Sequence, residues 1–109
     1  MELEAYTIKT YTTPEGNTPV MDWLSSLDAA NRVQILARVD RMKRNLGDHK
    51  TVKGFSGLYE ARIFKGPGYR LYFTIQGKTI IVLLCGGDKK SQARDIRLAG
   101  QLLESLKAE

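Results

Sequence analysis

The stretch Tyr69-Arg70-Leu71-Tyr72-Phe73-Thr74-Ile75 decides the fold, because its odd positions are apolar and its even positions are polar or amphipathic. Successive side chains of a β-strand point to opposite faces of a sheet, so this alternation predicts a strand with one face in a core. Residues 58–65 alternate in the same way, and residues 79–85 form an apolar run. Glycine-containing turns at 66–68 and 76–78 join the three stretches, which therefore predict an antiparallel meander.

The residues on either side of the meander predict one more strand and three helices. Residues 4–12 are rich in β-formers and predict the strand. Thr18-Pro19 predicts the start of a first helix, which extends to Leu27. Asp28 is placed to cap a second helix and Gly47 to end it, while Ser91 is placed to cap the last helix.

Both longer helices carry an apolar stripe at intervals of three or four residues. The stripe of the second helix consists of Val33, Leu36, Val39, Met42 and Leu46. The stripe of the last helix consists of Ile96, Ala99, Leu102, Leu103 and Leu106. The order strand, helix, helix, three strands, helix predicts an α+β fold of two layers, an antiparallel sheet backed by helices. With 109 residues and no repeat or linker, we expect one domain over residues 1–109.

Charge and composition narrow the function classes. The chain carries a net charge of +5, and its basic residues gather in residues 32–53 and 62–97. Such a surface suits a polyanion such as RNA, although a merely soluble basic protein has the same composition. One cysteine, Cys85, an acidic N-terminus and no long apolar run lead us to expect a cytoplasmic protein without disulfides.

The meander brings candidate site residues together. If the first two strands pair odd positions with odd positions, Arg62, Arg70 and Tyr72 share one open face. Guanidinium groups bind phosphate oxygens and an aromatic ring stacks on an unpaired base. The alternative is that Arg62 pairs with Glu60 as a solvated neighbour.

A second candidate is the loop Gly86-Gly87-Asp88-Lys89-Lys90-Ser91, which precedes a helix whose free amides favour anions. A solvated lysine-rich loop is the alternative reading. The single histidine, His49, is expected at the surface, and no metal site or cofactor is expected. Trp23 and Cys85 are expected in the core.

Three motifs together resemble one protein family. They are Gly57-Leu58-Tyr59-Glu60-Ala61-Arg62-Ile63, Gly66-Pro67-Gly68-Tyr69-Arg70-Leu71-Tyr72-Phe73 and the loop from Gly86 that continues to Gln92, Asp95 and Ile96. The chain resembles the HigB-like branch of the RelE/ParE superfamily of type II toxin–antitoxin toxins, from about Tyr6 to about Leu106. The resemblance implies a RelE-like fold, a ribosome-dependent endoribonuclease that inhibits translation without a metal, and a cognate helix-turn-helix antitoxin. DNA would be a partner only indirectly, through the antitoxin.

The resemblance also implies roles for individual residues. Arg62 and Arg70 match strand arginines of the family, and Lys89 and Lys90 match its Gly-Asp-Lys loop. We expect Arg70 to stabilise the reacting phosphate, Arg62 to position it, and Lys89 or Lys90 to assist proton transfer. The expected RNA-binding residues are Tyr72, Arg94, Arg38, Arg41 and Arg44. Where better-known RelE toxins place a tyrosine or histidine, this chain has Gln92, Arg94 and Asp95.

Two other functions fit the same residues. A ParE-like poison of DNA gyrase would use the fold to bind a protein and would need no phosphate-binding centre. A noncatalytic binding module would keep the fold without toxicity. The pairing of Arg62 and Arg70 with the Lys89-Lys90 loop favours the nuclease.

Overall fold

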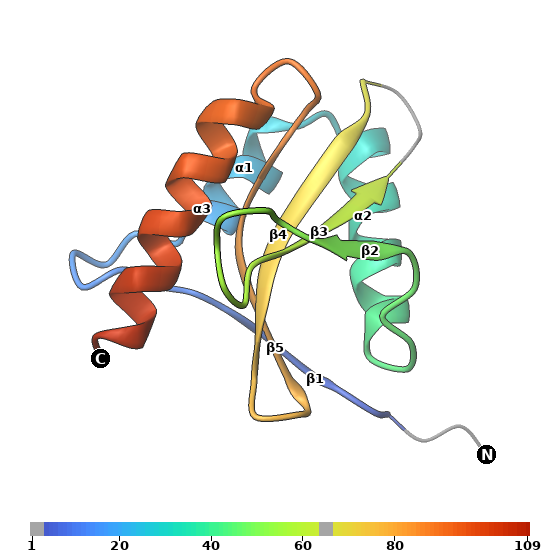
Figure 1. Cartoon of the computed structure of the whole chain (residues 1–109). Helices are drawn as coiled ribbons and strands as arrows, with labels where there is room; N and C mark the ends of the chain where they lie inside the picture. Colours follow the sequence, from blue (N-terminus) through green and yellow to red (C-terminus); the bar gives the residue numbers. More distant parts are fainter. Residues whose placement is uncertain (1–3, 64–66) are drawn as a thin grey trace.

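The computed structural model describes residues 4–63 and 67–109 (Figure 1). Its elements follow in the order β1 (Thr7–Thr10), α1 (Pro19–Ser26), α2 (Ala29–Met42), β2 (His49–Thr51), β3 (Tyr59–Ile63), β4 (Tyr69–Gln76), β5 (Ile80–Gly87) and α3 (Gln92–Lys107). The predicted positions 64–66, at the end of one strand and the start of the next turn, lie outside the described residues.

The five strands form one mixed sheet in the order β1-β5-β4-β3-β2. The predicted meander is confirmed, since β3, β4 and β5 pair antiparallel in sequence. Strand β1 is parallel to β5 at the opposite side of the sheet from β2. Strand β2 was not predicted, because three exposed residues are too few to show an alternation.

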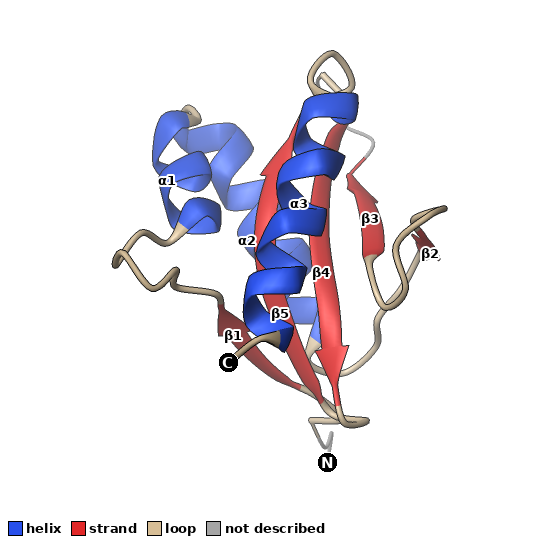
Figure 2. Ribbon diagram, turned by 60° about the vertical axis from the view of Figure 1, so that its left-hand side comes forward, coloured by secondary structure: helices blue, strands red, loops and turns tan. Residues whose placement is uncertain are grey.

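Helices cover both faces of the sheet. The face with Leu71, Phe73 and Ile81 packs on α1 and α2, whereas the face with Tyr72 and Leu84 packs on α3. Figure 2 shows α3 in front of β4 and β5, with α1 and α2 on the other side. The α+β class is confirmed, but the predicted two layers are three, because the apolar stripe of α3 needs a sheet face of its own.

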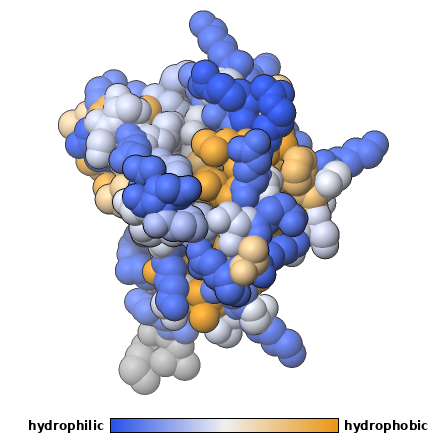
Figure 3. Space-filling view, turned by 90° about the vertical axis from the view of Figure 1, so that its left-hand side faces the viewer, coloured by the Kyte–Doolittle hydropathy of each residue, from blue (hydrophilic) through white to orange (hydrophobic). Residues whose placement is uncertain are grey.

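The outer surface of the molecule is largely polar. One side of the molecule, shown in Figure 3, is covered mainly by hydrophilic side chains with apolar patches between them. Within the described residues no helix is both long enough and apolar enough to cross a membrane.

The apolar stripe predicted for α2 is only partly correct: Met42 is buried and Val39 and Leu46 pack against the core, but Val33 and Leu36 do not. Val33 and Leu36 are 64% and 46% exposed, whereas Ile35, Arg38 and Met42 are buried. The buried stripe contains an arginine, whose aliphatic stem packs like an apolar chain, so a search for apolar residues alone misses it. The predicted cap is confirmed, because the carboxylate of Asp28 accepts a hydrogen bond of 2.9 Å from the amide of Asn31.

Gly86 and Gly87 belong to a strand rather than to the predicted loop, and they are needed there for close packing. Both lie in β5, and neither has a positive φ. A Cβ on Gly86 would come within 2.3 Å of the Trp23 ring on the α1 side, and one on Gly87 within 1.8 Å of the Asp95 carboxylate on the α3 side. The two glycines therefore let α1 and α3 approach the end of β5 from opposite faces.

Candidate functional site

The first two strands of the meander pair odd positions with odd positions, which is the condition on which the candidate site depended. Arg62 of β3 lies opposite Arg70 of β4, and Ala61 and Ile63 pair with Leu71 and Tyr69. Odd positions therefore face α1 and α2, as the alternation indicated. The even positions bring Glu60, Arg62, Arg70 and Tyr72 to the other face.

A buried carboxylate organises the two arginines. Glu60 is only 1% exposed, and its Oε1 accepts a hydrogen bond of 3.0 Å from Nε of Arg62. Nε of Arg70 lies 3.5 Å from the same oxygen. The amide of Gln92, at the start of α3, donates to Oε2 at 3.2 Å. The alternative pairing of Arg62 with Glu60 is thus present, but the carboxylate is buried rather than solvated.

The face predicted to be open is largely covered by α3. Tyr72 is 0% exposed, so its ring has no surface on which a base could stack, which contradicts its predicted RNA-binding role. Its hydroxyl has no hydrogen-bond partner among the described residues. Burial first, and then the carboxylates of Glu60 and Asp95, raise the pKa of Tyr72. The sequence alternation could not show this, because α3 comes from a distant part of the chain.

Three of the four predicted catalytic residues meet at one hollow. Arg62, Arg70 and Lys89 line a hollow of about 250 Å³, together with Ile63, Gly68 and Tyr69. The side chain of Arg70 is 10% exposed and that of Arg62 is 38% exposed. Nη1 of Arg70 also donates to the carbonyl of Gly68 at 2.8 Å. Lys90 is exposed in the same loop but does not line this hollow.

The start of α3 is occupied by carboxylates of the chain itself. The amide of Ser91 donates to Asp88 at 3.0 Å, and the hydroxyl of Ser91 donates to the carboxylate of Asp95. These bonds use donors that the sequence suggested for an external anion. The positive charge of the loop is therefore carried by the lysine side chains.

The predicted RNA-binding arginines lie on different surfaces. Arg38 is 8% exposed and donates to the backbone carbonyl of Asp48 at 2.8 Å. Arg41 is exposed beside it, and Arg44 lies 3.6 Å from the carboxylate of Asp40. Arg94 is 78% exposed on α3. Because Arg38 is buried and already bonded within the chain, the five predicted residues do not form one RNA-binding surface.

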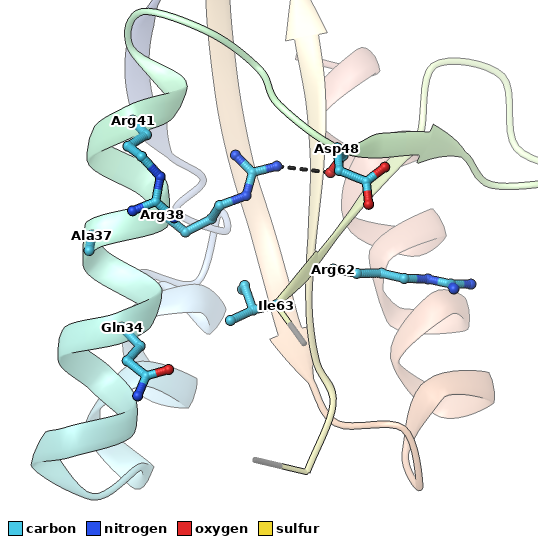
Figure 4. Close-up of a pocket in the computed structure, with 7 residues that line it drawn as sticks. All are labelled: Gln34, Ala37, Arg38, Arg41, Asp48, Arg62 and Ile63. Carbon is cyan, nitrogen blue, oxygen red and sulfur yellow. Dashed lines mark hydrogen bonds between the residues drawn. The ribbon is translucent and has the colours of Figure 1, made fainter. Parts of the chain in front are cut away.

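A groove runs between α2 and the end of β3. It has a volume of about 490 Å³ and is lined by Gln34, Ala37, Arg38, Arg41, Asp48, Arg62 and Ile63 (Figure 4). Burial and the neighbouring Arg41 lower the pKa of Arg38.

The sequence identified the arginines but missed the residues that hold them. The sequence suggested Glu60 only as a solvated partner of Arg62, and it predicted neither the bond from Gln92 to Glu60 nor the bond from Arg38 to the carbonyl of Asp48. Glu60 at an even strand position gave a signal, since the same alternation places it beside Arg62 and Arg70.

The histidine, the cysteine and the tryptophan of the chain have different surroundings. His49 is exposed, and its Nδ1 lies 2.8 Å from the carbonyl of Gly47. Cys85 is 2% exposed, and Trp23 packs edge-on against Tyr69, so both core assignments are confirmed. In residues 4–63 and 67–109, no group of three histidine, cysteine or acidic side chains is arranged to hold a metal ion.

Known proteins resemble this chain in sequence and in fold. The family described as Phage derived protein Gp49-like (DUF891) matches residues 22–104. An uncharacterized protein of Haemophilus influenzae is 42% identical over 86 residues, which cover 77% of this chain and 85% of that protein. A solved structure of a mutant of the E. coli toxin RelE in the free state aligns with a TM-score of 0.63 and 15% identity, over 88% of this chain and 94% of that chain. This structural likeness confirms the predicted RelE-like fold.

Proposed function

The chain belongs to the Gp49-like family of phage-derived proteins, and from this premise we propose that it is a toxin of a type II toxin–antitoxin system. We further propose that it is an endoribonuclease of the HigB-like kind, which cuts messenger RNA on the ribosome. The observation that carries this proposal is the convergence of Arg62, Arg70 and Lys89 at one hollow. Three cationic side chains around one small space suit a phosphate group of RNA.

The proposed reaction is attack of a ribose 2′-hydroxyl on the adjacent phosphorus. The bond to the 5′-oxygen of the next nucleotide breaks, and a 2′,3′-cyclic phosphate forms. Arg62, the more exposed arginine, binds the phosphate, while Arg70 stabilises the negative charge that develops on its oxygens. Lys89 donates a proton to the leaving 5′-oxygen. A group of the ribosome or the RNA accepts the proton of the 2′-hydroxyl.

In this proposal the ribosome orients the messenger RNA for cleavage. Orientation of two reacting groups alone lowers a barrier by several kcal/mol, so a chain with few acid–base groups at its hollow is sufficient when the ribosome holds the RNA. The exposed side chains of Lys90 and Arg94 would contact ribosomal RNA from separate surfaces. A cognate helix-turn-helix antitoxin and a cytoplasmic location belong to the same proposal.

Expression in bacteria tests the proposal. The wild-type chain is induced, and messenger RNA ends are mapped by primer extension beside the variants Arg62→Ala and Lys89→Ala. We expect new cuts within reading frames, reduced about 100-fold in Arg62→Ala, as is typical for loss of one cationic group that contacts the reacting phosphate. The matched control is Arg97→Ala, which removes an exposed arginine of α3 away from the hollow and should cut as the wild type does.

Other results reject either the nuclease or the role of Arg62 in it. Growth arrest with intact messenger RNA and altered supercoiling indicates a gyrase poison. Normal growth, with the folded chain present in the cells, indicates a noncatalytic binding module. Equal cutting by Arg62→Ala and the wild type removes Arg62 from the mechanism.

A further inference from the structure

The groove between α2 and β3 contains a buried cation without a carboxylate partner. Arg38 is 8% exposed, and its hydrogen bond goes to a backbone carbonyl, that of Asp48. Among the described residues, no acidic side chain lies within ion-pair distance of it. Buried charges in proteins are normally paired, so this guanidinium is suited to an anion from outside the chain.

The charges around Arg38 also favour an added anion. Arg41 lies one turn further along α2 and lines the same groove. Burial and the charge of Arg41 both lower the pKa of Arg38, and only Asp48 opposes them. An incoming carboxylate would relieve the repulsion between the two arginines.

The opposite wall of the groove is an open sheet edge. Strand β2 pairs with β3 only from Tyr59 to Ala61, and the chain bends away at Asp48. Within the described ladder, Arg62 and Ile63 therefore have no strand beside them on that side. Backbone N–H and C=O groups alternate in direction along a strand, so one of these two residues points its groups out of the open edge.

Figure 4 shows how the two walls face each other. Arg38 and Arg41 project from α2, Ile63 lies on the facing wall, and Asp48 stands at one end. The side chain of Arg62 points away from α2. A strand added along Ile63 would thus direct alternate side chains toward the two helix arginines.

We propose that this groove binds an extended peptide segment of a partner protein in which acidic and apolar residues alternate. The acidic side chains of the peptide bind Arg38 and Arg41. The peptide backbone pairs with the edge of β3 at Arg62 and Ile63, where β2 has ended. The lining favours a peptide over RNA, because none of the seven described residues that line the groove is aromatic, whereas the open edge of β3 offers backbone groups that pair with a peptide backbone. The inference is independent of RNA cleavage and can hold if the proposed function fails.

Binding of defined peptides to the purified full-length chain tests the proposal. The probe is a fluorescein-labelled peptide of alternating valine and glutamate, measured by fluorescence anisotropy. Its charge-reversed counterpart has lysine in place of glutamate, and a third version is N-methylated on alternate backbone amides. We expect binding of the first peptide only.

Variants locate the binding. Arg41→Ala should weaken the first peptide about tenfold, as expected for loss of one charge-assisted bond. Arg97→Ala removes the same charge from an exposed position outside the groove and should change binding less than twofold. Asp48→Asn should tighten binding, because it removes the negative charge at the groove's end.

The proposal is overturned if Arg41→Ala and Arg97→Ala bind the peptide equally, or if no peptide binds. It is also overturned if a single-stranded RNA displaces the peptide from the wild type and Arg41→Ala weakens the RNA more than the peptide, since the groove would then be an RNA site. Full binding of the N-methylated peptide would reject the added strand.

Discussion

Replacing Glu60 by glutamine tests the network that holds the two strand arginines. The carboxylate is 1% exposed and lies 3.0 Å from Nε of Arg62 and 3.5 Å from Nε of Arg70. Glutamine keeps the shape and one acceptor but removes the charge, which leaves the mostly buried Arg70 without a carboxylate. Breaking a buried ion pair on one side typically costs 3–5 kcal/mol, and the half-exposed Arg62 can be hydrated, so we expect a loss of about 3 kcal/mol.

Urea denaturation followed by the fluorescence of Trp23 measures this loss. The ring packs against Gly86 at the end of β5, so its emission reports on the sheet. The midpoint should fall with an unchanged m-value. The matched control is Glu104→Gln, at an exposed position of α3, for which we expect a change within about 0.5 kcal/mol.

A second variant separates charge pairing from packing. Glu60→Gln combined with Arg70→Met removes both buried charges and should be more stable than Glu60→Gln alone, because the remaining guanidinium, that of Arg62, can be hydrated. The reasoning is refuted if Glu60→Gln costs less than about 1 kcal/mol, or if the double variant loses the sum of the two single losses.

Two further predictions concern the buried groups beneath α3. Tyr72→Phe should leave the free energy of unfolding unchanged or raise it by about 1 kcal/mol, because it removes a buried hydroxyl without a partner; a fall of that size in urea denaturation would show that the hydroxyl is satisfied. Burial raises the pKa of Cys85 to about 12 from an ordinary value of 9.0. The free energy of unfolding is therefore highest below pH 9 and falls as the pH rises from 9 toward 12, because the unfolded chain loses the thiol proton first. We expect a loss of about 1 kcal/mol from Cys85 between pH 9 and pH 10, to which Tyr72 adds a smaller loss because it ionises near pH 10 in the unfolded chain. Denaturation at these two pH values should show a smaller difference for Cys85→Ala, and an equal difference in both proteins would assign it to another group.

The candidate site could be predicted in part because strand alternation is a local property. Positions 60, 62, 70 and 72 share a face wherever two strands pair in this register, and the structure has that register. Exposure is not local, however. Whether that face meets solvent depends on α3, whose position is fixed by Gly87 and by packing of its own apolar stripe.

The same distinction applies to α2. Its apolar residues suggested a buried face through Val33 and Leu36, yet the helix turns Ile35, Arg38 and Met42 inward. Periodicity counts residue types, whereas burial depends on the whole side chain, and the stem of an arginine can pack in a core. Because Arg38 lies on the inward face of α2, it lines the groove between α2 and β3.

The sequence by itself determined the order of the elements apart from β2, the antiparallel meander and the helix cap at Asp28, because spacing and turn residues encode these features locally. Only the tertiary structure decided that Glu60 is buried between the two arginines, that Tyr72 is covered, and that Lys89 joins Arg62 and Arg70 at one hollow. These contacts join residues separated by long stretches of chain, and they depend on how both helical layers pack on the sheet. The strand Tyr69–Gln76 illustrates both sides, since its alternation gives the direction of each side chain and the helices on its two faces decide what each side chain meets.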